Sequence, residues 1–194
     1  LAERGGDLAA LAARNGTQLR GEAAVAGAVP VLTLIDHALR GVEVGEIAAV
    51  LNGTSGYVLS RGLRDGLRLG EAVERARRLG FAEADPSLDL NGTDAAQKLS
   101  ILAARLGRAL PVAGTETPGR AGGRPGETAG GAELGLVFRP VAHARFDGDA
   151  ARAFVGPALV PASHPLASID EEKNGVGLRG EPVGEVFLAG PGAG

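Results

Sequence analysis

The hydrophobic period of this chain changes part-way along, and this change limits the possible folds more than any other feature. In the first half, apolar residues recur at helical spacing, as in Leu69, Ala72, Val73, Ala76 and Leu79. In the second half, the runs LGLVFRPVAHARF and ARAFVGPALV and the tail after residue 170 are typical of strands joined by turns. Helices followed by strands predict an α+β fold, in which helices cover one face of a sheet.

Turn residues set the expected limits of the elements. We expect a helix over 2–15, a helix that Pro30 opens and that ends near Gly41, and a buried strand over 46–51. Thr54 is the expected cap of the next helix, and two later helices end at Gly80 and Gly107. Asp147-Gly148 is the expected hairpin turn. Residues 114–131 are low in complexity and without an apolar period, and are expected to form a mobile loop.

Composition excludes several classes of function. The net charge of −3 gives no basic field for nucleic acid or an anionic membrane, and no apolar run is long enough to span a bilayer. The chain has no cysteine, so it has no disulfide and no thiolate metal site, which fits a cytoplasmic protein. It starts at Leu1 and ends in the glycine-rich GPGAG, which we interpret as a chain cut at both ends.

The most unusual stretch is GFAEADPSLDLNGTDAAQK, residues 80–98, where acids crowd a loop that runs into a helix. Asp94 and Lys98 are four positions apart, so their side chains share one helical face. The bland interpretation is an exposed salt bridge, worth about 0.3–0.5 kcal/mol. Against it, the loop delivers further carboxylates, and Lys98 is one of only two lysines among 20 basic residues. A lysine can give up and regain a proton at neutral pH, whereas an arginine cannot.

Other candidate residues carry weaker signals. The three histidines, His37, His143 and His164, are far apart and show no ligand spacing, so core or surface roles are favoured for each. The glycines of GPGAG are a weak phosphate signal in a chain with 32 glycines.

Several motifs, in order, resemble the homoserine dehydrogenase family: EAAVAGAVP, VLNGTSGYVL, GFAEADPSLDLNGTDAAQKLSILA, VGPALVPASHPLASID and VGEVFLAGPGAG. The resemblance covers the chain except about residues 112–132. It implies reduction of aspartate semialdehyde to homoserine with NADPH or NADH, on the route to threonine and methionine. It also implies a homodimer with a small-molecule substrate. Residues 1–20 would be the last helix of a nucleotide-binding domain, 21–180 the substrate-binding and dimerisation domain, and 181–194 the return toward the nucleotide domain.

The resemblance also implies roles for individual residues. Lys98 would be the proton donor. The substrate would be held by Glu83, Asp89, Asp94, Gly53 and Thr54. Backbone contacts to the cofactor would come from Gly190, Gly192 and Gly194. A monovalent cation, usually sodium, would be bound by Glu22 and the carbonyls of Val25, Gly27 and Val29; close packing of these small residues is the alternative.

The chain departs from the family pattern in several places. No G-x-G-x-x-G fingerprint follows a strand at the N-terminus, and a second family lysine is absent. Phe81 stands where tyrosine is common, and Gly56 stands where asparagine is usual. Residues 114–131 replace ordered helical sequence. A second hypothesis is therefore a non-catalytic, dimerising remnant of such an enzyme, and the chain alone is expected to be inactive.

Overall fold

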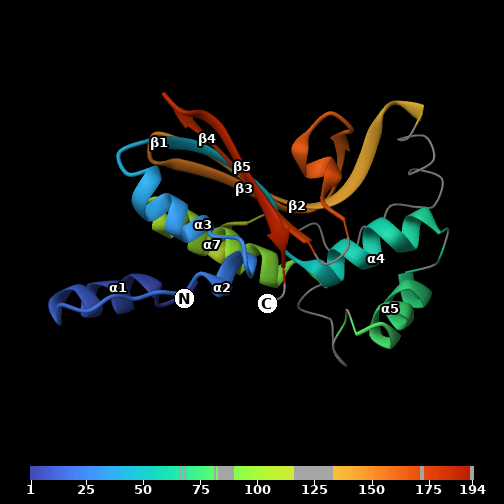
Figure 1. Cartoon of the computed structure of the whole chain (residues 1–194), viewed down its shortest axis with the longest axis horizontal. Coiled ribbons are helices and arrows are strands. Elements are labelled where there is room, and N and C mark those ends of the chain that lie inside the picture. Colours follow the sequence, from blue (N-terminus) through green and yellow to red (C-terminus); the bar gives the residue numbers. More distant parts are fainter. Residues whose placement is uncertain are drawn as a thin grey trace.

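The fold is built on one antiparallel sheet. The computed structural model describes residues 1–65, 67, 69–80, 82, 90–115, 133–170 and 173–192. The sheet has five strands in the order β3-β2-β1-β4-β5, so the first strand in the chain lies at its centre (Figure 1). The strands are β1 (Glu43–Val50), β2 (Leu136–Asp147), β3 (Ala150–Pro161), β4 (Lys173–Glu181) and β5 (Gly184–Pro191).

The helices precede the long hairpins in the chain. They are α1 (Gly5–Arg14), α2 (Ala23–Ala26), α3 (Val31–Thr33), the π-helical turn η1 (Leu34–Ala38), α4 (Gly53–Arg64), α5 (Leu69–Arg78) and α7 (Thr93–Arg105). Two short 3₁₀ turns, η2 (Val112–Gly114) and η3 (Pro165–Ser168), complete the described elements. The predicted helix after Pro30 is thus α3 continued by η1, and α1, α5 and α7 lie where helical periodicity placed them.

The main core lies between one face of the sheet and the helices α2, α3, η1 and α7 (Figure 1). Ile47 of the central strand and Leu99 and Leu102 of α7 are completely buried there. This confirms the predicted α+β arrangement of a sheet with helices on one face. A smaller cluster lies on the other face, where Leu166 and Ile169, at and just beyond η3, pack against Val141 of β2. A third cluster joins α4 to α5.

Two local predictions need correction. Asn52, not Thr54, caps α4: its Oδ1 accepts a hydrogen bond from the backbone N–H of Ser55 at 2.8 Å. The β2–β3 register pairs Asp147 with Ala150, so the turn is Gly148-Asp149, one residue later than expected. The cap lies two residues earlier and the turn one residue later than expected, because several neighbouring residues in each stretch suit a cap or a tight turn. Most of the expected 114–131 loop lies outside the described residues.

The two ends of the described chain meet the same segment, residues 21–28. Leu1 packs against Gly21, and at the other end the backbone N–H of Ala28 donates to the carbonyl of Pro191 at 3.2 Å. Gly27, at φ +62°, lies so close to Gly192 that an added Cβ would overlap the Gly192 carbonyl. The start of the chain and its last strand therefore lie near one another (Figure 1).

Candidate active site

The central feature of the site is an ion pair on α7. Asp94 lies in the first turn of this helix, and Lys98 lies one turn later, as the sequence spacing predicts. The Lys98 Nζ is 2.8 Å from Asp94 Oδ2, and the two side chains are only 22% and 28% exposed. A pair that is mostly shielded from water is held more firmly than the exposed salt bridge of the bland interpretation.

The turn between β1 and α4 holds this pair from the other side. The Leu51 carbonyl accepts a hydrogen bond from Lys98 Nζ at 3.0 Å, and Asn52 Nδ2 donates to Asp94 Oδ2 at 2.7 Å. Asn52 is buried. Sequence reasoning treated the Asn-Gly dipeptide as a turn former and missed this contact. The available signal was its place directly after a buried strand, where a polar side chain needs a partner.

The predicted substrate residues fall into two groups. Gly53 and Thr54 are the first residues of α4 and directly follow Asn52, the residue that contacts Asp94. Glu83 and Asp89 lie outside the described residues. Gly92, the residue just before α7, has φ +83°. This left-handed conformation lets the chain turn sharply into the helix.

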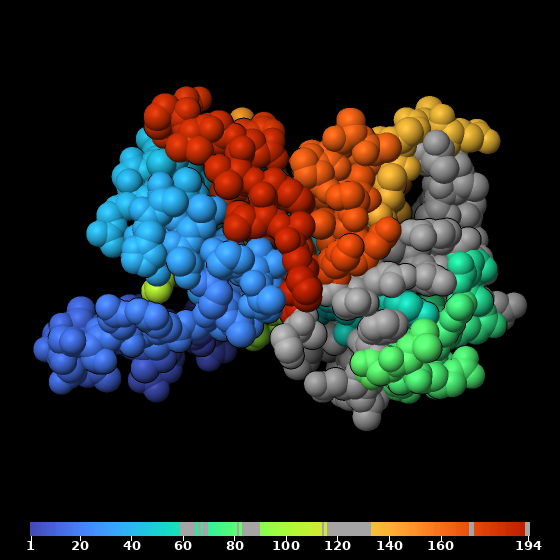
Figure 2. Space-filling view, viewed as in Figure 1, coloured from blue at the N-terminus to red at the C-terminus, as the bar shows by residue number. Residues whose placement is uncertain are grey.

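A cleft of about 490 Å³ opens beside the pair. Its walls include Asp94, Gln97 and Lys98 of α7 and, from the N-terminal segment, Glu3 and Arg4. Asp94 and Lys98 therefore both line the cleft. Figure 2 shows α1 as an arm at the edge of the molecule, and none of its residues is buried.

Glu22 uses its carboxylate to hold the start of α3. Its Oε1 accepts from the N–H of Leu32 at 2.6 Å, and its Oε2 accepts from the N–H and the hydroxyl of Thr33 at 2.9 and 2.6 Å. The carbonyl of Val29 accepts from the N–H of Val31 at 2.8 Å. Among the described residues no group of three or more His, Asp or Glu side chains gathers into a metal site. The cation site of Glu22, Val25, Gly27 and Val29 therefore stays a prediction.

The predicted cofactor glycines lie at the end of the last strand. Gly190 pairs with Asn174 in the sheet, Gly192 lies against Gly27, and Gly194 is outside the described residues. One G-x-G-x-x-G spacing does occur, at Gly175, Gly177 and Gly180, but all three residues lie within β4. A phosphate loop needs backbone N–H groups that face the ligand, whereas these belong to a paired strand.

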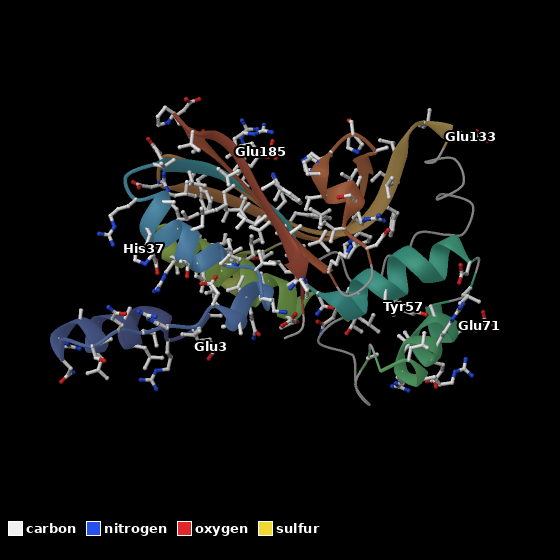
Figure 3. The ribbon with its side chains drawn as sticks, in the orientation of Figure 1. Glu3, His37, Tyr57, Glu71, Glu133 and Glu185 are labelled. Carbon is white, nitrogen blue, oxygen red and sulfur yellow. The ribbon has the colours of Figure 1, made fainter. Side chains whose placement is uncertain are left out.

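The histidines do not share a site. His164 Nδ1 accepts a hydrogen bond from Leu166 N–H at 3.1 Å beside η3. His143 lies 2.9 Å from Glu46 on the sheet face away from the main core, and this hydrogen bond lowers the pKa of the Glu46 carboxyl below its ordinary value of 4.5. His37 lies in the helical layer, on the opposite side of the sheet from Glu185 (Figure 3).

The structure thus defines an α+β sheet domain that carries a shielded lysine–carboxylate pair at the edge of a cleft. Comparison with known proteins specifies which enzyme family this is. The homoserine dehydrogenase family model matches residues 30–194. The chain belongs to the homoserine dehydrogenase family, whose members are oxidoreductases.

Individual relatives agree with this assignment. The homoserine dehydrogenase of Bacillus subtilis is 35% identical over all of this chain and 45% of its own length. The crystal structure of a homoserine dehydrogenase from Thiobacillus denitrificans superposes with a TM-score of 0.91 at 32% identity, covering 100% of this chain and 45% of that one. A hyperthermophilic archaeal homoserine dehydrogenase in complex with NADPH gives a TM-score of 0.83 at 28% identity, covering 100% and 56%. The chain thus spans about half the length of the relatives it matches.

Proposed function

We propose that this chain is the substrate-binding and catalytic part of a homoserine dehydrogenase that reduces L-aspartate 4-semialdehyde to L-homoserine. The observation that carries the proposal is the Lys98 ammonium, held by Asp94 and the Leu51 carbonyl at the edge of the cleft. The position of Lys98 suits a general acid, because a shielded ammonium with fixed partners presents its proton in one direction.

The reduction needs a hydride and a proton at the two ends of the carbonyl. A nicotinamide cofactor, NADPH or NADH, supplies the hydride to the carbonyl carbon when it is bound. Lys98 gives a proton from Nζ to the carbonyl oxygen, so that the developing alkoxide becomes a hydroxyl and the lysine becomes a neutral amine. Asp94 stabilises the ammonium before the transfer and orients it through its 2.8 Å contact.

The remaining substrate contacts are assigned by the family resemblance. Glu83 and Asp94 hold the amino and hydroxyl ends of the substrate, Asp89 is a further acid of the same site, and Gly53 and Thr54 contact the substrate from the start of α4. The product would serve threonine and methionine synthesis, and we place the protein in the cytoplasm. No helix of the described residues is long and apolar enough to cross a membrane.

The cofactor proposal rests mainly on residues beyond this chain. Of the three terminal glycines, Gly190 and Gly192 are described, and they offer backbone contacts only. The NADPH complex of the archaeal relative supports a nicotinamide dinucleotide as the partner. A separate nucleotide-binding domain, which the family resemblance implies, would have to hold the dinucleotide.

We further propose that a second copy of this chain covers the charged sheet face, formed by Glu46, His143, Arg179 and Glu185. Arg179 lies 3.1 Å from Glu185 and 3.8 Å from Glu46, so both signs of charge alternate across neighbouring strands. A patch with both signs is self-complementary about a two-fold axis. Sedimentation should give a dimer for the wild-type chain and a monomer for Arg179→Glu; a monomeric wild type would contradict the dimer.

The proposed reaction is tested by replacing Lys98 in a protein that joins this chain to an intact nucleotide-binding domain. We expect Lys98→Ala to lower kcat about 10²–10⁴-fold, the usual contribution of a general acid, with a much smaller change in KM. The matched control is Lys173→Ala, which replaces the other lysine, an exposed residue of β4. Near-normal turnover by Lys98→Ala would disprove the role of Lys98.

A further inference from the structure

Asn52 is fixed at both ends of its side-chain amide. It is 7% exposed, and its Oδ1 accepts from the Ser55 N–H at 2.8 Å while its Nδ2 donates to Asp94 Oδ2 at 2.7 Å. The cap contact settles which way the amide is turned, because only the oxygen can accept from a backbone N–H. The NH₂ group must then face Asp94.

Asp94 Oδ2 therefore receives two donors, one from Asn52 and one from Lys98. Two donors on one oxygen fix the rotation of the carboxylate, since any swing of the group would break both hydrogen bonds. The residue before Asn52 contributes as well, because the Leu51 carbonyl accepts from the same ammonium. Residues 51 and 52 thus hold both members of the pair that α7 carries.

The ammonium of Lys98 has three N–H groups and, within the described residues, two protein partners, Asp94 and the Leu51 carbonyl. With these two directions occupied, the tetrahedral nitrogen presents its third N–H along one remaining direction. Lys98 also lines the cleft. Where that third N–H lies depends on where Asp94 is held.

We propose that Asn52 is a positioning residue for the reaction: it fixes the carboxylate of Asp94 and, through it, the direction in which Lys98 offers its proton. The inference rests on the proposed function, since it assigns Asn52 to the same site. It goes beyond helix capping, which would require only the Oδ1 contact to Ser55.

Two roles of Asn52 can be separated because a serine performs one of them alone. Asn52→Ser keeps an N-cap oxygen for the Ser55 N–H, but its side chain is too short to cap α4 and reach Asp94 together. Asn52→Ala removes both contacts. Asn52→Asp keeps the size and the cap while it replaces the donor to Asp94 with a carboxylate oxygen.

The test observes Lys98 directly in the 194-residue chain. Lys98 and Lys173 are its only lysines, so ¹⁵Nζ-lysine labelling gives two ammonium signals, with exposed Lys173 as an internal control. We expect hydrogen exchange at the Lys98 ammonium to become about tenfold faster in Asn52→Ser and in Asn52→Ala, the ratio set by loss of one hydrogen bond to a charged group. Asn52→Asp should also shift the Lys98 signal, and the Lys173 signal should not move in any variant.

An unchanged Lys98 signal in both Asn52→Ser and Asn52→Asp would overturn the proposal, and would leave Asn52 as a helix cap only. A second measurement uses the protein joined to a nucleotide-binding domain, where Asn52→Ser should lower kcat about tenfold with little change in KM. If Lys98→Ala kept full turnover there, the proposed function would fail, whereas the exchange measurement would still decide whether Asn52 positions the pair.

Discussion

Single polar side chains form hydrogen bonds between different segments of this molecule. Glu22 is the clearest case outside the site, because its carboxylate accepts three hydrogen bonds from Leu32 and Thr33 at the start of α3. The helix dipole also stabilises a carboxylate at the start of a helix. This observed role is separate from the cation site that the family resemblance predicts at the same residue.

Glu22→Gln should therefore destabilise the chain whether or not sodium is present. The amide leaves only one acceptor oxygen and turns an NH₂ group toward backbone donors, so we expect a loss of about 1–3 kcal/mol in the free energy of unfolding. Urea unfolding of the two proteins in choline chloride measures it. A variant as stable as the wild type would contradict the role of Glu22 at α3.

The same titrations in sodium chloride at equal ionic strength test the cation. If the carbonyls of Val25, Gly27 and Val29 bind sodium with Glu22, the wild type should gain stability in sodium, and the gain should shrink in Glu22→Gln. Equal stability of the wild type in both salts would exclude a sodium site of this kind.

The Glu46–His143 pair makes a pH prediction. The hydrogen bond from His143 lowers the pKa of Glu46 in the folded chain, with Arg179 and Arg145 adding to the effect and burial opposing it. The unfolded state then takes up a proton first, so the contribution to stability is complete above the ordinary value of 4.5 and is lost as pH falls toward the folded pKa. The pair is partly exposed, which keeps this contribution small.

His143→Ala should reduce this acid-side loss, and Glu46→Gln should remove it. Unfolding free energies measured at several pH values below 4.5 give the slope for each protein. If the slope were the same in all three proteins, Glu46 would not contribute to acid sensitivity.

At the residue scale, only local relationships could be predicted from the sequence. The Asp94–Lys98 pair follows from a spacing of four on one helix. The contact of Asn52 with Asp94 joins positions 42 apart, and no local pattern encodes it. The same holds for Glu22, whose partners at Leu32 and Thr33 depend on how the 22–31 segment folds back on itself.

At the scale of elements, residues 21–28 lie so close to the end of β5 that a larger side chain at Gly27 does not fit. Gly27 has φ +62°, and its Cα lies against the Gly192 carbonyl. An alanine there meets backbone strain and a steric overlap with backbone atoms that cannot move aside easily.

Gly27→Ala should therefore destabilise the chain more than Gly41→Ala. Gly41 also has positive φ, +84°, but an added Cβ there meets nothing within 4 Å, so this variant measures backbone strain alone. We expect about 1–2 kcal/mol for Gly41→Ala and clearly more for Gly27→Ala. Thermal unfolding of both variants checks the order, and equal losses would mean that the segment yields to the added methyl group.

Elements were predictable where one period dominates. The apolar faces of α5 and α7 and the strand-like run LGLVFRPVAHARF of β2 identified their type, and Gly80 and Gly107 marked helix ends, both with positive φ. Strand order was not predictable, because it depends on which hairpins pair at the central strand. β1 lies between β2 and β4, strands that are about 90 and 130 residues away in the chain.

At the scale of the whole molecule, reduction of a carbonyl needs a hydride donor as well as a proton donor. The described part of the chain holds the proposed proton donor, Lys98, and a cleft, but its one G-x-G-x-x-G spacing lies inside β4. Holding a nicotinamide near the carbonyl accounts for several kcal/mol of barrier lowering, and backbone contacts at Gly190 and Gly192 are too few to hold a dinucleotide.

The purified 194-residue chain should therefore not oxidise NADPH measurably in the presence of aspartate semialdehyde. The same chain joined to a nucleotide-binding domain should do so. Turnover by the chain alone that Lys98→Ala abolishes would show that the second domain is dispensable. No turnover in the joined protein, with an intact fold, would favour the non-catalytic remnant.

The convergence of both chain ends on residues 21–28 has a topological consequence. A domain whose two ends lie close together can be inserted into a loop of another domain. The two segments of that host domain on either side of the insertion then stay next to each other. The same geometry suits circular permutation: a short flexible linker could join residue 192 to Leu1, with new termini opened at the exposed β2–β3 turn near Gly148. The covalent order of the chain would change, while the sheet and the Asp94–Lys98 pair would keep their places.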